Sequence, residues 1–191
     1  KRDMQLHHEW APQGQTIVGY VGRLAREKEV ERLKVLSGRP GIKLVIVGDG
    51  PLRSSLEKSM PDATFTGVLR GEELARAFAT LDVFVHTGLN ETFCQAIQEA
   101  LASGVPVVGP AAGGPLDIIQ HRQNGLLWSP EHPESLAGAV QQLSEDVLLR
   151  RLLASHGRNS VVGRTWSSVM NDLVDHYQAV IGTTPLLRRT A

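Results

Sequence analysis

The chain has 191 residues, 41% of them hydrophobic and 21% charged, which suits one globular domain with its own core. Twenty basic and twenty acidic residues balance, which argues against a protein that binds nucleic acid or another polyanion through bulk charge. The single cysteine, Cys94, excludes an intramolecular disulfide and a cysteine-based zinc cage. No apolar run reaches the roughly 18–20 residues that a membrane span needs.

Apolar runs alternate with helical spacing along most of the chain. Runs rich in Val and Ile and bounded by Gly or Pro predict six strands, at 16–21, 42–47, 63–66, 82–86, 105–108 and 125–128. Helical spacing occurs between them at 29–38, 51–60, 71–80, 92–103 and 114–121, and after them at 133–144, 146–158 and 165–181. The alternation predicts an α/β fold: a Rossmann-like parallel sheet of about six strands with helices on both faces.

No repeat or internal linker interrupts this pattern, so we expect one domain over residues 1–191. The last residues, at about 183–191, have no periodicity and are expected to form a flexible tail. Trp166, Leu173 and Tyr177 carry helical spacing and are expected to pack. The chain does not begin with Met, and we expect it to be a piece of a longer protein.

The residues after the first strand could bind a diphosphate. In an open parallel sheet, ligands lie beyond the carboxyl ends of the strands. There, Gly22 permits a tight turn, and Arg23 and Lys28 place two cations in one loop. Arginine suits bidentate contact with an oxyanion, and lysine supplies a mobile charge. The alternative is a solvated charged loop, because other charged residues stand alongside.

Two further strand ends carry weaker signals. After the second strand, Gly48 and Gly50 could let a ligand approach the backbone, although neither a complete dinucleotide fingerprint nor a P-loop is present. The alternative is a strand-to-helix turn with Pro51 at the first helical position. After the third strand, the backbone of residues 68–70 could approach a flat ligand such as a base.

The stretch after the fourth strand contains the start of a helix. Thr92 and Gln95 form a capping-box pattern that predicts Thr92 as the N-cap. The N–H groups of Phe93, Cys94 and Gln95 would then lie at the helix start, where an anion is favoured.

Two carboxylates flank this predicted anion position. Glu91 stands just before the helix and Glu99 about two turns into it, and carboxylates accept hydrogen bonds from sugar hydroxyls. An anion with diols on either side describes a nucleotide sugar. The alternative for each Glu is an exposed carboxylate; their placement with Arg23 and Lys28 favours the site.

The remaining candidates are a glycine turn and a histidine. Gly113 and Gly114 after the fifth strand could present backbone amides to an anion or simply form a turn that needs positive φ. His86 ends the fourth strand and could contact the ligand, but a surface or capped histidine is the favoured alternative. The seven histidines show no metal-binding spacing.

Taken together, YVGRLAREK, VGDGP, ETFCQAIQEALASGVPVV and PAAGGPLD resemble the C-terminal, donor-binding domain of the retaining glycosyltransferases of family GT4, which is one half of a GT-B fold. The resemblance covers about residues 15–180. These motifs look closest to those of the actinobacterial GDP-mannose-dependent α-mannosyltransferases that build glycolipids. The family's common E-G-F-G reads Glu91-Thr92-Phe93-Cys94 here.

The resemblance implies a role for each matching residue. Arg23 and Lys28 would bind the diphosphate and offset the charge on the leaving nucleotide, while Glu91 holds donor-sugar hydroxyls and Glu99 the ribose. Backbone amides near Phe93 would reach the sugar and phosphate. The implied catalytic residues are Arg23, Lys28 and Glu91. The implied donor-binding residues are Gly22, Gly48, Gly50, Val68, Leu69, Arg70, Thr92, Phe93, Cys94 and Glu99.

The implied reaction moves a hexose, mannose from GDP-mannose, onto a lipid, glycolipid or glycan, with no metal or other cofactor and no nucleic-acid partner. An N-terminal GT-B domain of the same parent chain would carry much of the acceptor cleft, so this chain alone should bind nucleotide without transferring sugar. The expected location is the cytoplasm, including the inner face of the cell membrane. The alternatives are a non-catalytic nucleotide-sugar binding module, or a GT-B-like epimerase or synthase that uses UDP or ADP sugars.

Overall fold

The computed structural model describes residues 2–183, so the expected tail lies outside the described residues from 184 on. The chain divides into two compact units, Lys1–Ser160 and Val161–Ala191. The first unit contains the whole sheet.

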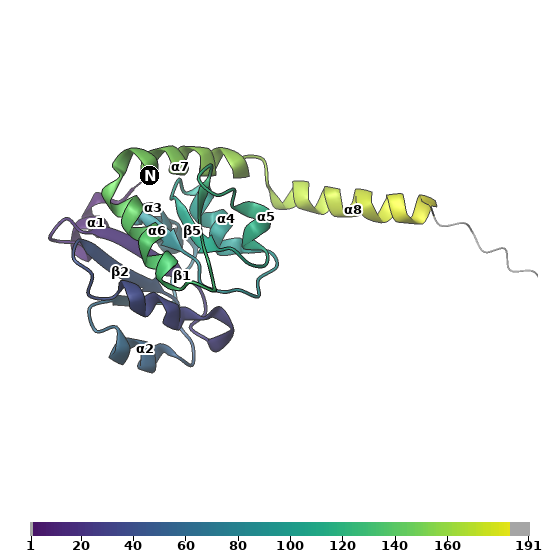
Figure 1. The fold of residues 1–191 in the computed structure, drawn as a ribbon. Coiled ribbons are helices and arrows are strands. Elements are labelled where there is room, and N and C mark those ends of the chain that lie inside the picture. Colours follow the sequence, from purple (N-terminus) through teal and green to yellow (C-terminus); the bar gives the residue numbers. More distant parts are fainter. Residues whose placement is uncertain (1, 184–191) are drawn as a thin grey trace, which may run out of the picture. The chain divides into compact units, whose positions relative to one another are not determined.

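All six predicted strands are present and form one parallel sheet in the order β3-β2-β1-β4-β5-β6 (Figure 1). The strands are β1 (Thr16–Val21), β2 (Ile42–Val47), β3 (Thr64–Gly67), β4 (Val83–Val85), β5 (Val107–Pro110) and β6 (Gly125–Trp128). The bounds of β1, β2 and β6 agree with the sequence patterns, and those of β3, β4 and β5 differ by one or two residues. The predicted fold class is confirmed.

The first unit contains seven α-helices and two 3-10 helices within its described residues. They are α1 (Met4–Trp10), η1 (Arg26–Lys28), η2 (Val30–Leu36), α2 (Arg53–Ser59), α3 (Gly71–Thr80), α4 (Gln95–Ala102), α5 (Pro115–Ile118), α6 (Glu134–Glu145) and α7 (Val147–Val161). The segment predicted at 29–38 is therefore 3-10 rather than α-helical. Helix α1 was not predicted; the Asp3 side chain caps it by accepting from the amides of Gln5 and Leu6. Pro51 is not the first helical residue, because α2 begins at Arg53.

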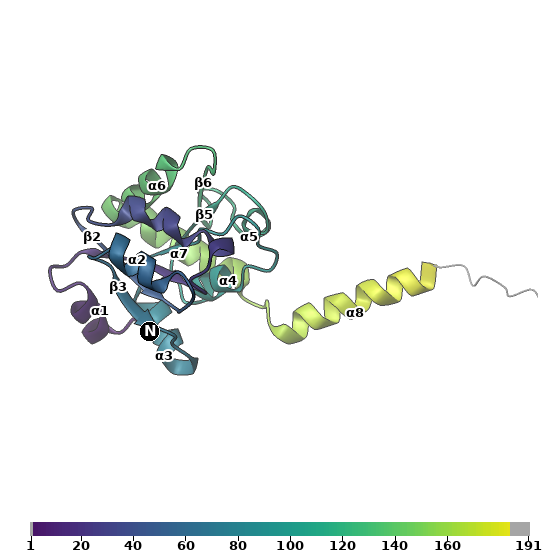
Figure 2. The same ribbon diagram turned by 90° about the horizontal axis from the view of Figure 1, so that it is seen from below.

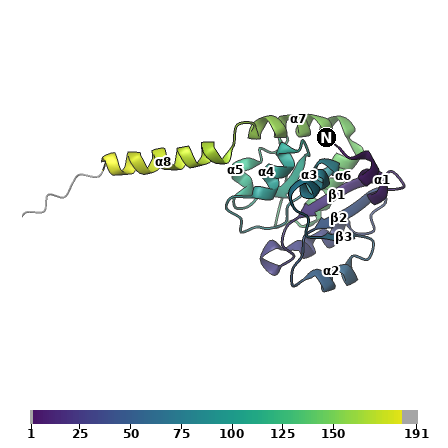
Figure 3. The same cartoon turned by 180° about the vertical axis from the view of Figure 1, so that it is seen from behind.

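Helices cover both faces of the sheet. One face packs against η2, α2 and α6, which bury Leu33, Leu56 and Val140 against β-strand residues (Figures 1 and 2). The other face lies under α1, α3, α4 and α5 (Figure 3). There the ring of Phe78 in α3 lies 5.8 Å from that of Phe84 in β4. Burial of β4, β5 and most of β1 and β2 explains why these sequences are continuous apolar runs rather than alternating ones.

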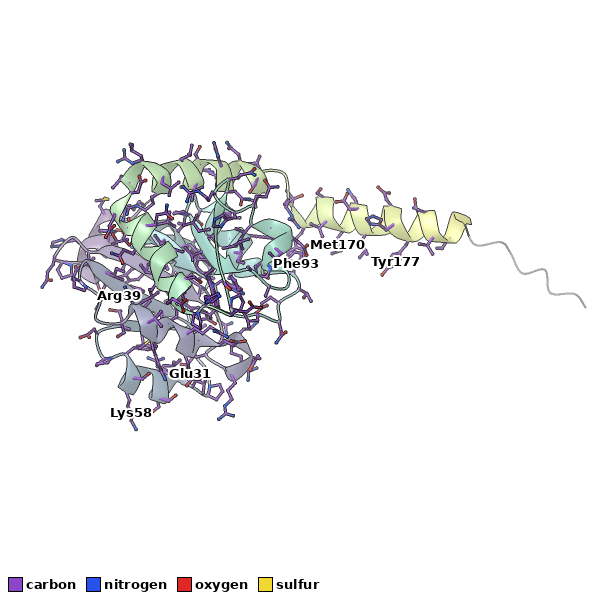
Figure 4. All side chains as sticks on the ribbon, in the orientation of Figure 1. Glu31, Arg39, Lys58, Phe93, Met170 and Tyr177 are labelled. Atoms are coloured by element: carbon purple, nitrogen blue, oxygen red, sulfur yellow. The ribbon has the colours of Figure 1, made fainter. Side chains whose placement is uncertain are left out.

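The second unit is built around α8 (Trp166–Thr183), a helix with an exposed apolar stripe. Trp166, Leu173 and Tyr177 are 61%, 42% and 61% exposed. The expectation that they pack stays a prediction. Met170 and Tyr177 project from the same side of α8 (Figure 4). Within residues 2–183, no helix has both the length and the apolar character that crossing a membrane requires.

Candidate functional site

The site lies where the strand order reverses. β1 and β4 are neighbours at the centre of the sheet, with β2 and β3 beyond one and β5 and β6 beyond the other. In open α/β sheets this switch point opens a crevice outside the carboxyl ends of the strands. The loop after β1 carries Lys28, and the loop after β4 carries Glu91. The topology therefore explains how two residues that are 63 positions apart come together.

Lys28 and Glu91 form an ion pair at this crevice. Lys28 Nζ lies 2.5 Å from Glu91 Oε1, and the two side chains are 33% and 14% exposed. The Thr87 hydroxyl donates to the carbonyl of Lys28 at 2.6 Å and so fixes the lysine backbone to the end of β4. Two of the three predicted catalytic residues are thus in direct contact, and each is the other's charge partner.

Arg23, the third predicted catalytic residue, stands apart from this pair. Its side chain is 68% exposed and its nearest carboxylate is that of Glu27, at 3.7 Å. An exposed pair of this kind is weak, so the guanidinium can turn to another anion. The backbone is better fixed, because the buried hydroxyl of Tyr20 donates to the carbonyl of Arg23 at 3.1 Å. A Cβ at Gly22 would lie 2.9 Å from the same hydroxyl, so this position is closely packed.

Gly48 and Gly50 bring the loop after β2 against the loop after β1. A Cβ at Gly48, where φ is +133°, would lie 2.0 Å from the carbonyl oxygen of Gly22. A Cβ at Gly50 would lie 2.4 Å from the carbonyl oxygen of Leu24. Contact between two backbones therefore accounts for both glycines. Their approach to a ligand stays a prediction.

The loop after β3 also lies at the carboxyl ends of the strands. Val68 is 56% exposed, Leu69 is partly buried and Arg70 is exposed. Arg70 is extended, with φ −141° and ψ 159°, and α3 begins directly after it. The predicted contact of this loop with a base remains a prediction.

The start of α4 differs from the prediction. Thr92 is not the N-cap: the N-cap is Cys94, in the left-handed conformation with φ 51° and ψ 48°, and no side chain caps it. The first amide to reach an intrahelical acceptor is that of Ile97, bonded to the Cys94 carbonyl at 3.0 Å. The open amides of the first turn are therefore those of Gln95 and Ala96, later than predicted.

Cys94 is a buried, unreactive thiol in this conformation. It is 4% exposed, and burial, together with the charge of Glu91, raises the pKa of the thiol to about 11. A non-glycine residue in the left-handed region is uncommon, and nothing in the sequence predicts it at this position. The left-handed residue directly precedes Gln95, so the helix begins later than predicted.

Glu99 lies within α4, one turn after Gln95. The Gln95 side-chain amide donates to Glu99 Oε1 at 2.8 Å, so the carboxylate is directed toward the helix start. The second oxygen can accept from a further donor. Its predicted contact with a ribose remains a prediction.

Gly113 and Gly114 lie against the loop that carries Glu91. The Gly114 amide donates to the carbonyl of Glu91 at 2.8 Å. A Cβ at Gly113 would lie 2.4 Å from the carbonyl oxygen of Leu89, and one at Gly114 would lie 2.5 Å from that of Thr92. Gly113 also has φ +58°, so its need for positive φ is confirmed. The two glycines position the Glu91 loop.

The favoured alternative for His86 is wrong, because the ring is neither surface-exposed nor capped, and its contact with a ligand stays a prediction. Its side chain is 8% exposed, and Nε2 lies 3.9 Å from Glu91 Oε1. Burial lowers the pKa of His86 to about 4; the charge of Glu91 opposes this shift and that of Lys28 adds to it. The ring is therefore neutral at pH 7. A sequence pattern cannot show an unpartnered ring, because burial depends on the packing of distant strands.

No group of three or more His, Cys, Asp or Glu side chains that could hold a metal ion occurs among residues 2–183. The positively charged side chains of Arg23 and Lys28 lie in the loop after β1. The expectation that no metal takes part stays a prediction.

A family model described as "Glycosyl transferases group 1" matches residues 5–160. A GDP-mannose-dependent alpha-mannosyltransferase of Mycolicibacterium smegmatis is 50% identical over 186 residues, which are 97% of this chain and 49% of that protein. A protein of the same name from Corynebacterium glutamicum is 51% identical over 183 residues, 95% of this chain and 44% of that protein. The chain thus spans about half the length of the curated relatives it matches.

One solved structure has nearly the extent of this chain. The C-terminal domain of a glycosyl transferase group 1 family protein from Francisella tularensis has the same fold, with a TM-score of 0.69 and 24% identity. The match covers 84% of this chain and 93% of that domain.

Proposed function

Because the chain belongs to the glycosyl transferases group 1 family and has the fold of its C-terminal GT-B domain, we propose that it is the donor-binding half of a retaining mannosyltransferase. The parent enzyme moves mannose from GDP-mannose onto a glycolipid, lipid or glycan. The observation that carries this proposal is the Lys28–Glu91 pair at the switch point of the sheet. The chain that contains this pair is 50% identical in sequence to a GDP-mannose-dependent relative. The identity of the donor and that of the acceptor are both proposed.

Arg23 and Lys28 neutralise the diphosphate in this proposal. Both follow β1, and the exposed Arg23 is held only by a weak pair with Glu27 at 3.7 Å. Lys28 leaves Glu91 and turns to the phosphates when the donor binds. The charge that develops on the leaving nucleotide then meets these two cations, so no metal is needed. Removing one such contact costs on the order of 100-fold in rate.

The carboxylates hold the sugar parts of the donor. Glu91 accepts from hydroxyls of the mannose, and Glu99 accepts from the ribose. The open amides at the start of α4 face the phosphates between them. The exposed backbone of residues 68–70 approaches the guanine. This assignment uses one loop from each of three strand ends, as a ligand at a switch point does.

The acceptor side belongs to an N-terminal GT-B domain of the same parent chain. The relatives are about twice as long as this chain, which supports that division. The exposed stripe of α8, which includes Trp166, Met170 and Tyr177, is of the apolar kind that packs on another domain. A cytoplasmic site at the inner face of the membrane would suit a lipid acceptor.

Titration of the chain with GDP, UDP and ADP, read by calorimetry, tests the donor. We expect GDP to bind most tightly. Binding of UDP or ADP alone would contradict the GDP-mannose assignment and favour a synthase or epimerase. Activity of the parent enzyme separates catalysis from a module that only binds nucleotide sugars.

A further inference from the structure

His86 is a buried polar side chain with no hydrogen-bond partner. Neither Nδ1 nor Nε2 of its ring finds one anywhere in residues 2–183. Buried polar groups are almost always paired, and one that is not requires an explanation. The hydrogen bonds of the Lys28–Glu91 pair do not include His86.

The position of this ring is well defined. The His86 amide donates to the Val108 carbonyl of β5 at 2.9 Å. The indole of Trp128, at the end of β6, donates to the His86 carbonyl at 3.2 Å. Hydrogen bonds of the His86 backbone with β5 and with the Trp128 side chain thus hold the residue in place, and the unpaired nitrogens are not the result of a loose segment.

The nearest charged groups are the two members of the ion pair. Nε2 lies 3.9 Å from Glu91 Oε1, which is the same oxygen that Lys28 contacts at 2.5 Å. Two donors therefore stand at one acceptor oxygen, and only Lys28 is within hydrogen-bond distance of it. A shift of about 1 Å would bring the imidazole within that distance.

We propose that His86 is a positioning residue that takes over from Lys28 as the hydrogen-bond donor to Glu91 when Lys28 turns to the diphosphate of the donor. This inference rests on the proposed function, since it needs Lys28 to leave Glu91. The step is an exchange of hydrogen bonds in which no covalent bond changes. Lys28 trades a carboxylate for a phosphate, and Glu91 trades an ammonium for an imidazole.

The exchange removes a penalty that donor binding would otherwise carry. Glu91 is 14% exposed, and a carboxylate left buried without a donor is strongly destabilised. A neutral imidazole has one N–H, which suffices for this bond. With Oε1 held by His86, the second oxygen of Glu91 is oriented for the sugar hydroxyls.

A double-mutant cycle on the 191-residue chain tests the exchange, with the GDP dissociation constant as the readout. We expect His86→Leu to weaken GDP binding about 10-fold, the scale of one hydrogen bond to a charged group. In a Lys28→Met background the same change should have little effect, because Glu91 there has no lysine to lose. A purely structural role of His86 would weaken binding equally in both backgrounds and would overturn the inference.

Two conservative variants identify the nitrogen that acts. The amide nitrogen of Gln reaches the place of the imidazole Nε2, whereas that of Asn reaches the place of Nδ1. We expect His86→Gln to restore GDP affinity and His86→Asn not to restore it. Equal behaviour of the two variants would contradict the assignment of Nε2.

The unmodified chain provides a test that does not depend on a variant folding. In ¹⁵N NMR spectra, the His86 Nε2 signal should move to a hydrogen-bonded position when GDP is added. An unchanged signal in the presence of bound GDP would overturn this inference alone. If GDP does not bind at all, the proposed function fails and this inference fails with it.

Discussion

Glu99 in α4 and Glu145 in α6 make the same kind of local hydrogen bond but lie at opposite ends of the strands of the sheet. Gln95 donates to Glu99 in α4 at 2.8 Å, and Gln141 donates to Glu145 in α6 at 2.8 Å. Glu145 lines a cavity with Thr16 at the start of β1, so it lies at the amino ends of the strands, whereas the site lies at their carboxyl ends. The two residues therefore form a matched pair for substitution.

We expect Glu99→Ala to weaken GDP binding and Glu145→Ala to leave it unchanged. Losing a hydrogen bond from a charged acceptor corresponds to about 10-fold in the dissociation constant. Both changes remove the same intrahelical bond, so their effects on stability should be similar. Calorimetric titration with GDP is the measurement. Equal affinities of the two variants would show that Glu99 does not contact the ribose.

His86 makes the stability of the fold depend on pH. Its pKa is about 4 in the folded chain because the ring is buried, against about 6.5 in an unfolded chain. Between these values the unfolded chain binds more protons, so acid favours unfolding. The contribution is complete above about pH 6.5 and decreases as the pH falls toward 4.

We therefore expect the free energy of unfolding to fall by about 2 kcal/mol between pH 7 and pH 5 through His86 alone. Urea denaturation at several pH values measures it. In His86→Leu this component should be absent, whatever the effect of the substitution on stability at pH 7. Parallel pH profiles for the two proteins would mean that the ring is not held neutral by burial.

At the scale of the elements, the close approach of two loops depends on glycine. Gly113 and Gly104 both have positive φ, at +58° and +71°. A Cβ at Gly104 would meet nothing within 4 Å, whereas one at Gly113 would lie 2.4 Å from the Leu89 carbonyl oxygen. A comparison of alanine substitutions at Gly104 and Gly113 therefore separates the cost of a positive φ from the cost of steric crowding.

We expect Gly104→Ala to lower the free energy of unfolding by about 1 kcal/mol, the effect of a left-handed alanine. Gly113→Ala should lower it by about 1–3 kcal/mol more, since the loop carrying Glu91 must move. GDP affinity should fall only in Gly113→Ala. Urea denaturation and calorimetry measure the two effects. If Gly104→Ala impairs GDP binding as strongly, displacement of the Glu91 loop is not the cause.

The order and type of most elements could be predicted, because buried parallel strands leave continuous runs such as IKLVIV at 42–47. The helix start at Gln95 could not be predicted from its sequence. The capping pattern of Thr92 is a local signal, and the left-handed Cys94 overrides it, in a loop whose residues Glu91 and Thr92 lie against the glycines after β5. Likewise, the sequence indicated Lys28 and Glu91 as site residues, but their contact depends on β1 and β4 being neighbours.

For the whole molecule, the first unit contains the complete sheet and every candidate site residue. A chain ending at residue 164 should therefore keep its fold and its affinity for GDP. It should also associate less with itself, because the exposed apolar residues of α8 are removed. Thermal unfolding, calorimetry and light scattering test these three statements. Loss of GDP binding would show that α8 takes part in the donor site.

Catalysis by the 191-residue chain requires an acceptor site as well as a donor site. The charge on the leaving nucleotide can be offset by Arg23 and Lys28, but a transfer also needs an acceptor held against the donor sugar. In our proposal the N-terminal domain supplies that surface. We therefore expect no mannosyl transfer from labelled GDP-mannose to a glycolipid acceptor, although GDP binds.

The full-length GDP-mannose-dependent alpha-mannosyltransferase of Mycolicibacterium smegmatis provides the positive control, assayed with the same labelled donor. A chain that binds GDP and transfers nothing has its donor site formed and its acceptor site missing. Robust transfer by the 191 residues alone would instead place both substrates on one domain. The division of labour between two halves would then be wrong, whereas the donor assignment would stand.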